Sequence, residues 1–221
     1  MMRELGNAQD ASADDQGPDL DLAFEQQTRS LRHNLVIRAG KLVSPHGEFV
    51  CVVRDVSETG VGLRLFHDPP TGEPLELQMP DGGTYEIRQV REDGNHVGYE
   101  FVNVIDVPRF LVENPDFPKR GLRLNLAFPV TVRSLAGTNE GLVENLSQHG
   151  ARLSCEGIYA IDQNLFVDCP EDEVRFREVG AKVRWRRDSE YGVVFENTLS
   201  LEEFAKLAAE LQCPDLLRSD A

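Results

Sequence analysis

Short apolar segments follow one another along most of the chain, and polar turn residues separate them. The segments are rich in Val, Ile, Leu, Phe and Tyr, and Gly, Asn, Asp and Pro interrupt them at short intervals. Strands of this length with such turns are typical of an all-β barrel or sandwich. In the first half of the chain the predicted strands are 36–43, 48–55, 60–66, 85–91 and 96–102.

One helix is predicted near the C-terminus. Ser200 is followed three residues later by Glu203, which is the pattern of a capping box at a helix start. We expect this helix to lie on the neighbouring β-domain and residues 214–221 to form a short tail. The apolar residues that recur with helical spacing on one face are Leu201, Phe204, Leu207, Ala208 and Leu211.

Charge is unevenly distributed along the chain. The whole sequence has 38 acidic and 23 basic residues, which gives a formal charge of −15. Residues 1–25 hold seven acids, one base and little apolar surface, so we expect a disordered acidic tail over residues 1–26. The negative balance disfavours general binding to nucleic acid or to anionic membrane surfaces, but it leaves room for a local basic site.

Composition narrows the class of protein further. No apolar run approaches the roughly 18 residues of a spanning helix, and residues 1–16 lack the pattern of a signal peptide, so we expect no membrane insertion. The widely spaced Cys51, Cys155, Cys169 and Cys213 predict reduced thiols in the cytoplasm, with neither a metal nor a cofactor. Motifs of common enzyme classes are also missing from the sequence, so we predict no catalytic residues and no enzyme.

The two halves of the chain repeat one another. Landmark residues recur in the same order at offsets of 90 to 94, which predicts two copies of one β-domain, at 27–113 and 116–213. Two prolines within 114–118 mark the joint, because proline limits both helices and strands. The joint is short, so we expect the domains to touch. The matched pairs are Arg32 with Arg123, Asp55 with Asn145, Ser57 with Ser147, Gly60 with Gly150, Gly98 with Gly192 and Phe101 with Phe195.

These motifs resemble those of PilZ domains. The Asp-x-Ser-x-x-Gly segment at 55–60 and the Asn-x-Ser-x-x-Gly segment at 145–150 are similar to the family's (Asp/Asn)-x-Ser-x-x-Gly motif, and an arginine-bearing segment precedes each. Residues 117–133 resemble the family's Arg-x-x-x-Arg approach to the first strand, and residues 182–195 resemble its closing hairpin. The resemblance implies an all-β fold of two tandem six-stranded β-barrels with a C-terminal helix. It also implies the bacterial second messenger cyclic di-GMP as the ligand.

The chemistry of such a ligand accounts for these residue types. Arginine can bond guanine O6 and N7 with two donors, neutralise phosphate and stack on a base. An Asp or Asn oxygen accepts from the guanine donor edge, and a Ser hydroxyl adds a further bond. Glycine lets the backbone turn sharply or lets a base approach closely.

The resemblance implies one preferred and one weaker ligand site. The second domain keeps three bases in its arginine segment, although a lysine stands at one arginine position and lacks the planar fork. In the first domain Thr28 stands at that position, so we expect this domain to act as a scaffold or as a dimerising partner in a homodimer. The preferred site comprises Lys119, Arg120, Arg123, Asn145, Ser147 and Gly150, and the weaker site comprises Arg29, Arg32, Asp55, Ser57 and Gly60.

Some of these residues also have plainer interpretations. The Asp, Asn and Ser of the motifs can act as turn residues that bond their own backbone, and the basic residues can be solvated charges. Trp185 lies between Arg184 and Arg186, where a basic flank could indicate base stacking. Strand alternation places it on the face opposite both arginines, so we interpret it as a core residue.

Two hypotheses of different class follow from the sequence. The leading one is a non-catalytic bacterial receptor that binds cyclic di-GMP and relays its level to an effector protein. The alternative is a degenerate PilZ-like interaction or dimerisation module that binds no nucleotide. A nucleic-acid-binding barrel is disfavoured by the charge of −15.

Overall fold

The computed structural model describes residues 33–112, 121–171 and 174–217. All of these described residues belong to one folded unit. The predicted acidic tail lies outside the described residues. So do four residues of the candidate sites, namely Arg29, Arg32, Lys119 and Arg120.

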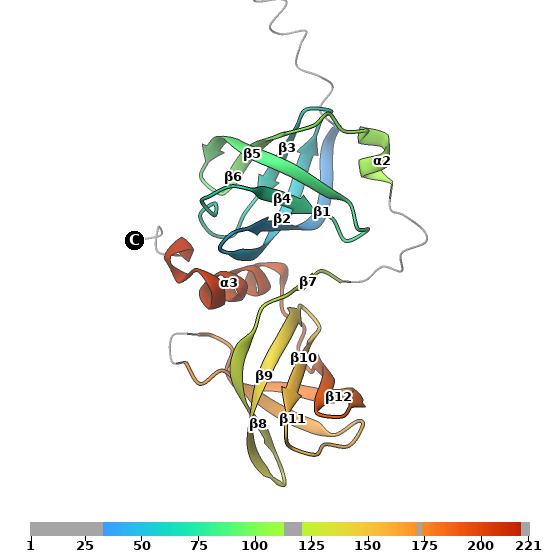
Figure 1. The fold of residues 1–221 in the computed structure, drawn as a ribbon, viewed down its shortest axis with the longest axis vertical. Coiled ribbons are helices and arrows are strands. Elements are labelled where there is room, and N and C mark those ends of the chain that lie inside the picture. Colours follow the sequence, from blue (N-terminus) through green and yellow to red (C-terminus); the bar gives the residue numbers. More distant parts are fainter. Residues whose placement is uncertain (1–32, 113–120, 172–173, 218–221) are drawn as a thin grey trace, which may run out of the picture. The chain divides into compact units, whose positions relative to one another are not determined.

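The first half of the described chain forms a closed antiparallel barrel (Figure 1). Its strand order is β1-β2-β3-β6-β5-β4, and pairing of β1 with β4 closes the ring. Alternating apolar residues of these strands fill the interior, with Phe49, Leu63, Leu77 and Ile87 almost fully buried. The strands are β1 (His33–Ser44), β2 (Gly47–Val56), β3 (Gly60–Arg64), β4 (Leu75–Gln78), β5 (Thr84–Asp93) and β6 (His96–Phe101).

The second half repeats this arrangement. Six strands close in the order β8-β9-β10-β13-β12-β11, and a further short strand, β7 (Arg123–Leu124), pairs with the end of β9. The fold predicted from the sequence, two tandem six-stranded barrels with a C-terminal helix, is therefore confirmed. The strands of the second barrel are β8 (Phe128–Ser134), β9 (Gly137–Ser147), β10 (Gly150–Cys155), β11 (Asn164–Asp168), β12 (Val179–Arg187) and β13 (Glu190–Phe195).

The sequence pattern missed several short elements. The strand β4 and the five-residue helix α2 (Val107–Leu111), which the side chain of Asp106 caps, were not predicted. Within the predicted tail at 214–221, residues 214–217 form the 3-10 helix η1 (Pro214–Leu217). Leu216 and Leu217 pack against the core of the first barrel, and this apolar contact gives the segment a fixed place.

The C-terminal helix α3 (Leu201–Gln212) begins with the predicted capping box. Ser200 Oγ accepts from the Glu203 N–H, and the Glu203 carboxylate accepts from the Ser200 N–H. Its apolar face joins the core of the second barrel, whereas Ala209 belongs to the core of the first. The helix therefore contributes to both cores, and the residues it buries are Phe204, Ala205, Leu207, Ala208 and Ala209.

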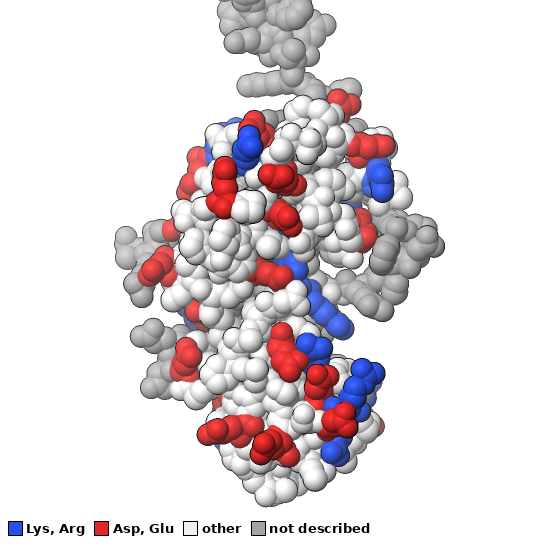
Figure 2. All heavy atoms as spheres, viewed as in Figure 1, with Lys and Arg blue, Asp and Glu red and all other residues white. Residues whose placement is uncertain are grey.

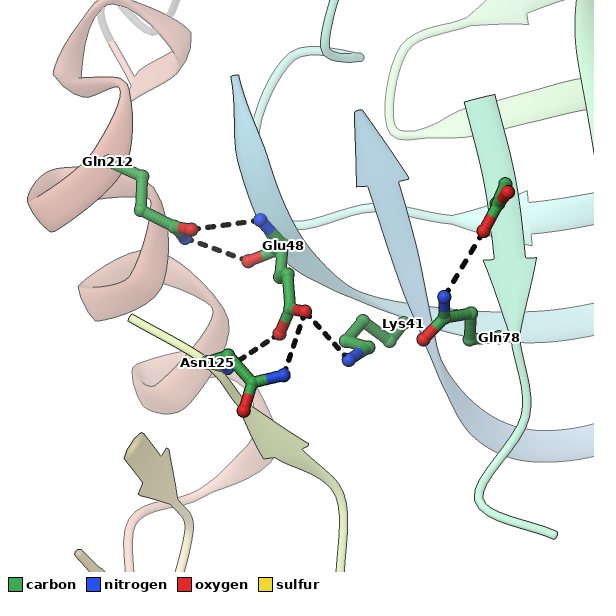
Figure 3. A network of polar contacts seen from close by, with 6 residues as sticks. Lys41, Glu48, Gln78, Asn125 and Gln212 are labelled. Atoms are coloured by element: carbon green, nitrogen blue, oxygen red, sulfur yellow. Dashed lines mark hydrogen bonds and ion pairs between the residues drawn. The ribbon is translucent and has the colours of Figure 1, made fainter. Parts of the chain in front are cut away.

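A polar network centred on Glu48 connects the two barrels and α3 (Figure 3). The Gln212 side-chain amide accepts from the Glu48 N–H and donates to the Glu48 carbonyl, both at 2.8 Å. The Glu48 carboxylate accepts from the Asn125 backbone N–H at 2.6 Å and from its side-chain amide at 3.1 Å. It also pairs at 2.9 Å with the Lys41 ammonium, whose side chain is mostly buried. The expected contact between the domains is thus a specific one.

Among the described residues, no helix has the length and hydropathy needed to cross a membrane.

Candidate functional site

A β-bulge precedes the Asx-x-Ser-x-x-Gly motif in each barrel. The register of the ladder shifts by one residue at this point, in β2 of the first barrel and in β9 of the second. The extra residue and the first residue of the motif then face a single residue on the next strand. These trios are Arg54, Asp55 and Gly62 in the first barrel and Glu144, Asn145 and Arg152 in the second.

The serine of each motif closes the turn that follows. Ser57 Oγ lies 3.2 Å from the Gly60 carbonyl oxygen, to which it donates, and accepts from the Gly60 N–H at 3.1 Å. Ser147 Oγ donates to the Gly150 carbonyl at 3.0 Å. The plainer interpretation of the motif, in which serine shapes the turn, therefore holds in both barrels, whatever else the serines do.

The glycine of the second motif has no room for a side chain. A Cβ at Gly150 would overlap the backbone carbonyl oxygen of Val193 on β13. The corresponding space at Gly60 is wider, because its Cβ would lie 3.0 Å from the Tyr99 carbonyl oxygen. Close approach of two strands, rather than an unusual φ angle, is what requires glycine here.

The strand β7 brings Arg123 to the motif. Arg123 pairs with Ser147 across the β7–β9 ladder, and its neighbour Leu124 is fully buried. Because side chains alternate along a strand, burial of Leu124 turns Arg123 outward, where it is exposed. One residue of the predicted arginine segment thus lies directly opposite the motif serine.

A second bulge places Trp185 on the surface. The register of β12 shifts between Val183 and Trp185, so Arg184 is the extra residue and Trp185 pairs with Gly192 on β13. The indole occupies the space that a side chain at Gly192 would fill. Trp185 is 43% exposed. The prediction that it is a core residue was therefore wrong, because the bulge interrupts the alternation on which that prediction relied.

These features surround a pocket of about 710 Å³ on the second barrel. Arg123, Asn145, Ser147 and Gly150 all line it, so the structure brings together the described members of the preferred site. A pocket of this size falls in the range that binds cofactors and similar small molecules. Trp185 also lines it and offers an exposed aromatic surface.

The pocket is basic although the protein is acidic. Its lining includes Arg123, Arg152, Arg184 and Arg187, against one acidic residue, Glu190. Figure 2 shows basic side chains gathered along one side of the second barrel, the lower part of the view, with acidic ones beside them. Clustered arginines give a local positive potential that can hold an anion despite a negative net charge.

The weaker site of the first barrel differs in its side chains. The carboxylate of Asp55 occupies the space next to Gly62 that a Cβ there would fill. Arg91 pairs with Gly98, in the position that Trp185 and Gly192 have in the second barrel. Of the predicted members, Asp55, Ser57 and Gly60 lie together at the motif turn.

Sequence reasoning missed Arg152, Arg184 and Arg187 as members of the pocket lining. Arg152 stands two residues after the motif glycine, and residues two apart on a strand share a face, so the motif itself contained a signal for it. Arg184 and Arg187 lie on β12, and the bulge that changes which way this strand presents its residues leaves no mark in the sequence.

Among the described residues there is no group of His, Cys, Asp and Glu that could hold a metal ion. The four cysteines are free thiols, and burial raises the pKa of the Cys51 thiol to about 12. A thiol with so high a pKa remains protonated at neutral pH and is a poor nucleophile.

The model of the PilZ domain family matches the chain twice, over residues 26–110 and 118–212. The chain belongs to the PilZ family. The comparisons indicate no enzyme family for it.

Several solved structures are similar to this chain. One is PlzA from Borreliella burgdorferi in complex with c-di-GMP, with 10% identity, coverage of 86% of this chain and 97% of that chain, and a TM-score of 0.34. Another is apo MrkH from K. pneumonia, with 12% identity, coverage of 79% and 87%, and a TM-score of 0.31. The Bacillus subtilis inhibitor of motility (MotI/DgrA) has 12% identity, coverage of 80% and 96%, and a TM-score of 0.32. No curated protein matches the chain.

Proposed function

We propose that this protein is a non-catalytic receptor for cyclic di-GMP that binds the dinucleotide on its second barrel and relays the signal to an effector protein. The observation that carries the proposal is the basic pocket in which Arg123, Asn145, Ser147 and Gly150 meet. Membership of the PilZ family supports the choice of ligand.

Each residue of the pocket has a role in this proposal. Arg123 supplies charge and two parallel donors for a phosphate or for guanine O6 and N7. The Asn145 amide oxygen accepts from the guanine N1 and N2 donors. Gly150 has no side chain that would project into the pocket. The exposed indole of Trp185 offers a face on which a base stacks. Lys119 and Arg120, which lie outside the described residues, add two further positive charges.

In this proposal the first barrel is a scaffold whose contact with β7 changes when a ligand binds to the second barrel. Asn125, two residues after Arg123, donates twice to Glu48 of the first barrel. A ligand that shifts β7 therefore changes a contact with the first barrel, provided that it binds the shifted state better. We propose domain boundaries at 27–113 and 116–213 and a cytoplasmic location, in keeping with free thiols.

Titration calorimetry with cyclic di-GMP tests this function. We expect saturable binding to the full chain and a change in the fluorescence of Trp185, which is the single tryptophan. The matched variants Ser147→Ala and Ser57→Ala alter the same turn in the two barrels, and only Ser147→Ala is expected to weaken binding. If the wild-type chain gives no heat of binding with cyclic di-GMP, the proposed receptor function is rejected.

The first barrel carries the observation that favours the alternative function, an interaction module without nucleotide. In the first barrel, Gly62 and Arg91 stand at the positions equivalent to Arg152 and Trp185, and Asp55 occupies the space beside Gly62. If the wild-type chain binds no cyclic di-GMP but forms a homodimer in analytical ultracentrifugation, this module is the better description of the whole chain.

A further inference from the structure

Arg152 occupies the centre of a row of residues that crosses the pocket wall. On β10 it pairs with Asn145 of β9 on one side and with Gly192 of β13 on the other. Gly192 in turn pairs with Trp185 of β12, whose indole lies over it. Arg152 therefore lies between the motif amide and the aromatic ring, and its side chain is 42% exposed.

Glu144, on the neighbouring strand β9, forms an ion pair with Arg152. Arg152 Nε lies 2.8 Å from Glu144 Oε2, and the Glu144 side chain is only 24% exposed. Nε is itself buried, and its N–H is not aligned for a hydrogen bond, so the contact is an ion pair. Among the described residues, Glu144 is the charged partner of Arg152. The contact is made at Nε, so the two Nη groups of the guanidinium are not used by this ion pair.

We propose that Arg152 determines the specificity of this site by reading the O6/N7 edge of a guanine base, and that Glu144 is the positioning residue that keeps it aligned. The proposal rests on the proposed function, since it assigns a role within the same pocket. Guanine presents two acceptors on this edge, whereas adenine presents one acceptor and one donor. A guanidinium that donates through two parallel N–H groups therefore favours guanine over adenine.

The position of Arg152 argues for a base edge rather than for phosphate alone. In the proposed arrangement a base stacks on the exposed indole of Trp185 with one edge along the row, in which Arg152 follows Gly192. The first barrel has Gly62 and Arg54 in place of Arg152 and Glu144, so the pair belongs to the second barrel. Both halves of the pair are therefore present in the barrel that also has the pocket and the tryptophan.

The test compares cyclic di-GMP with cyclic di-AMP, on the full chain, by calorimetry and by competition. In Arg152→Ala we expect the affinity for cyclic di-GMP to fall about 10-fold or more, with a much smaller change for cyclic di-AMP. Arg152→Lys keeps the positive charge but loses the two parallel N–H donors of the guanidinium. It should therefore also lose the preference for cyclic di-GMP over cyclic di-AMP. Glu144→Gln should lose part of it, because Arg152 is then no longer held.

The matched control is Arg133→Ala, which removes another arginine of the same barrel. Arg133 pairs with Glu178 at 2.9 Å and does not line the pocket, so both affinities should stay unchanged. Equal losses for the two dinucleotides in Arg152→Ala would overturn the proposal and show a contact with phosphate. Full discrimination in Arg152→Lys would overturn it as well. A wild-type chain that binds no cyclic di-GMP would reject the proposed function itself, and this inference with it.

Discussion

The two barrels share one turn but surround it with different side chains. In both, a bulge leads into the motif and a serine hydroxyl closes the turn on the motif glycine. Beside that turn the second barrel has Arg152 and Trp185, whereas the first has Gly62 and Arg91. The motif therefore builds the turn, and the residues on the neighbouring strands determine which side chains surround it.

The difference also separates the tasks of the two barrels. The second barrel presents the arginine-lined pocket, and the first contributes Lys41 and Glu48 to the polar network that receives β7 and α3. One copy of the fold thus has an arginine-lined pocket, and the other has a polar surface that contacts its neighbour. This division predicts that matched substitutions have unequal effects in the two barrels.

Alanine at the two motif glycines should affect the barrels unequally. A Cβ at Gly150 overlaps the Val193 carbonyl and forces β10 away from β13, so Gly150→Ala should cost more than about 3 kcal/mol of unfolding free energy. Gly60→Ala has 3.0 Å to the nearest backbone atom and should cost about 1 kcal/mol. Urea unfolding followed by Trp185 fluorescence and by circular dichroism measures both. Equal losses would mean that the two turns are packed alike.

Glu48→Gln should disconnect the polar network. The substitution leaves the Lys41 ammonium mostly buried without its carboxylate and places an amide opposite the Asn125 donors, so we expect a loss of about 2–3 kcal/mol of unfolding free energy. Glu202→Gln is the matched control, because it breaks the exposed pair with Lys206 on α3 and should leave the unfolding midpoint unchanged. Unfolding curves of the two variants that coincide would contradict a structural role for Glu48.

Arginine substitutions compare the barrels as ligand sites. Arg123→Ala should weaken binding of cyclic di-GMP by about 1.5–3 kcal/mol, roughly 10- to 150-fold, because it removes a charge-assisted contact. Arg32→Ala, the equivalent change in the first domain, should cost several-fold less affinity, since that domain keeps fewer bases. Calorimetric titration gives both constants. A larger loss at Arg32 would move the site to the first domain.

Acid should destabilise the first barrel through His67. Burial lowers the pKa of this imidazole below 6.5, and Nε2 has no hydrogen-bond partner among the described residues. The unfolded chain therefore takes up a proton first, so stability is full above the unfolded pKa and falls as pH drops from about 6.5 towards the folded pKa. The slope approaches about 1.4 kcal/mol per pH unit in that window.

Unfolding curves at several pH values test this dependence. His67→Gln should remove it, and His96→Gln, at an exposed position of the same barrel, should retain it. A pH dependence that survives in His67→Gln would assign the effect to other groups.

Much of the fold could be predicted from the sequence because its signals are local or repeated. Period-two alternation and turn residues identified most strands, and Ser200 with Glu203 identified the start of α3. The offset of 90 between Asp55 and Asn145 identified the duplication without any structure. Four predicted members of the preferred site line one pocket, namely Arg123, Asn145, Ser147 and Gly150. Their role in binding a ligand stays a prediction.

The tertiary structure decided what depends on register and on distant neighbours. The bulge at Arg184 turned Trp185 from the expected core to the surface, and the bulge at Glu144 brought Arg152 into opposition with Asn145. A bulge inserts one residue into a ladder, and its position depends on the pairing partner, which the local sequence does not specify. The Glu48 network joins residues 77 and 164 positions apart. Local periodicity thus determined which segments are strands, and strand pairing determined which side chains meet.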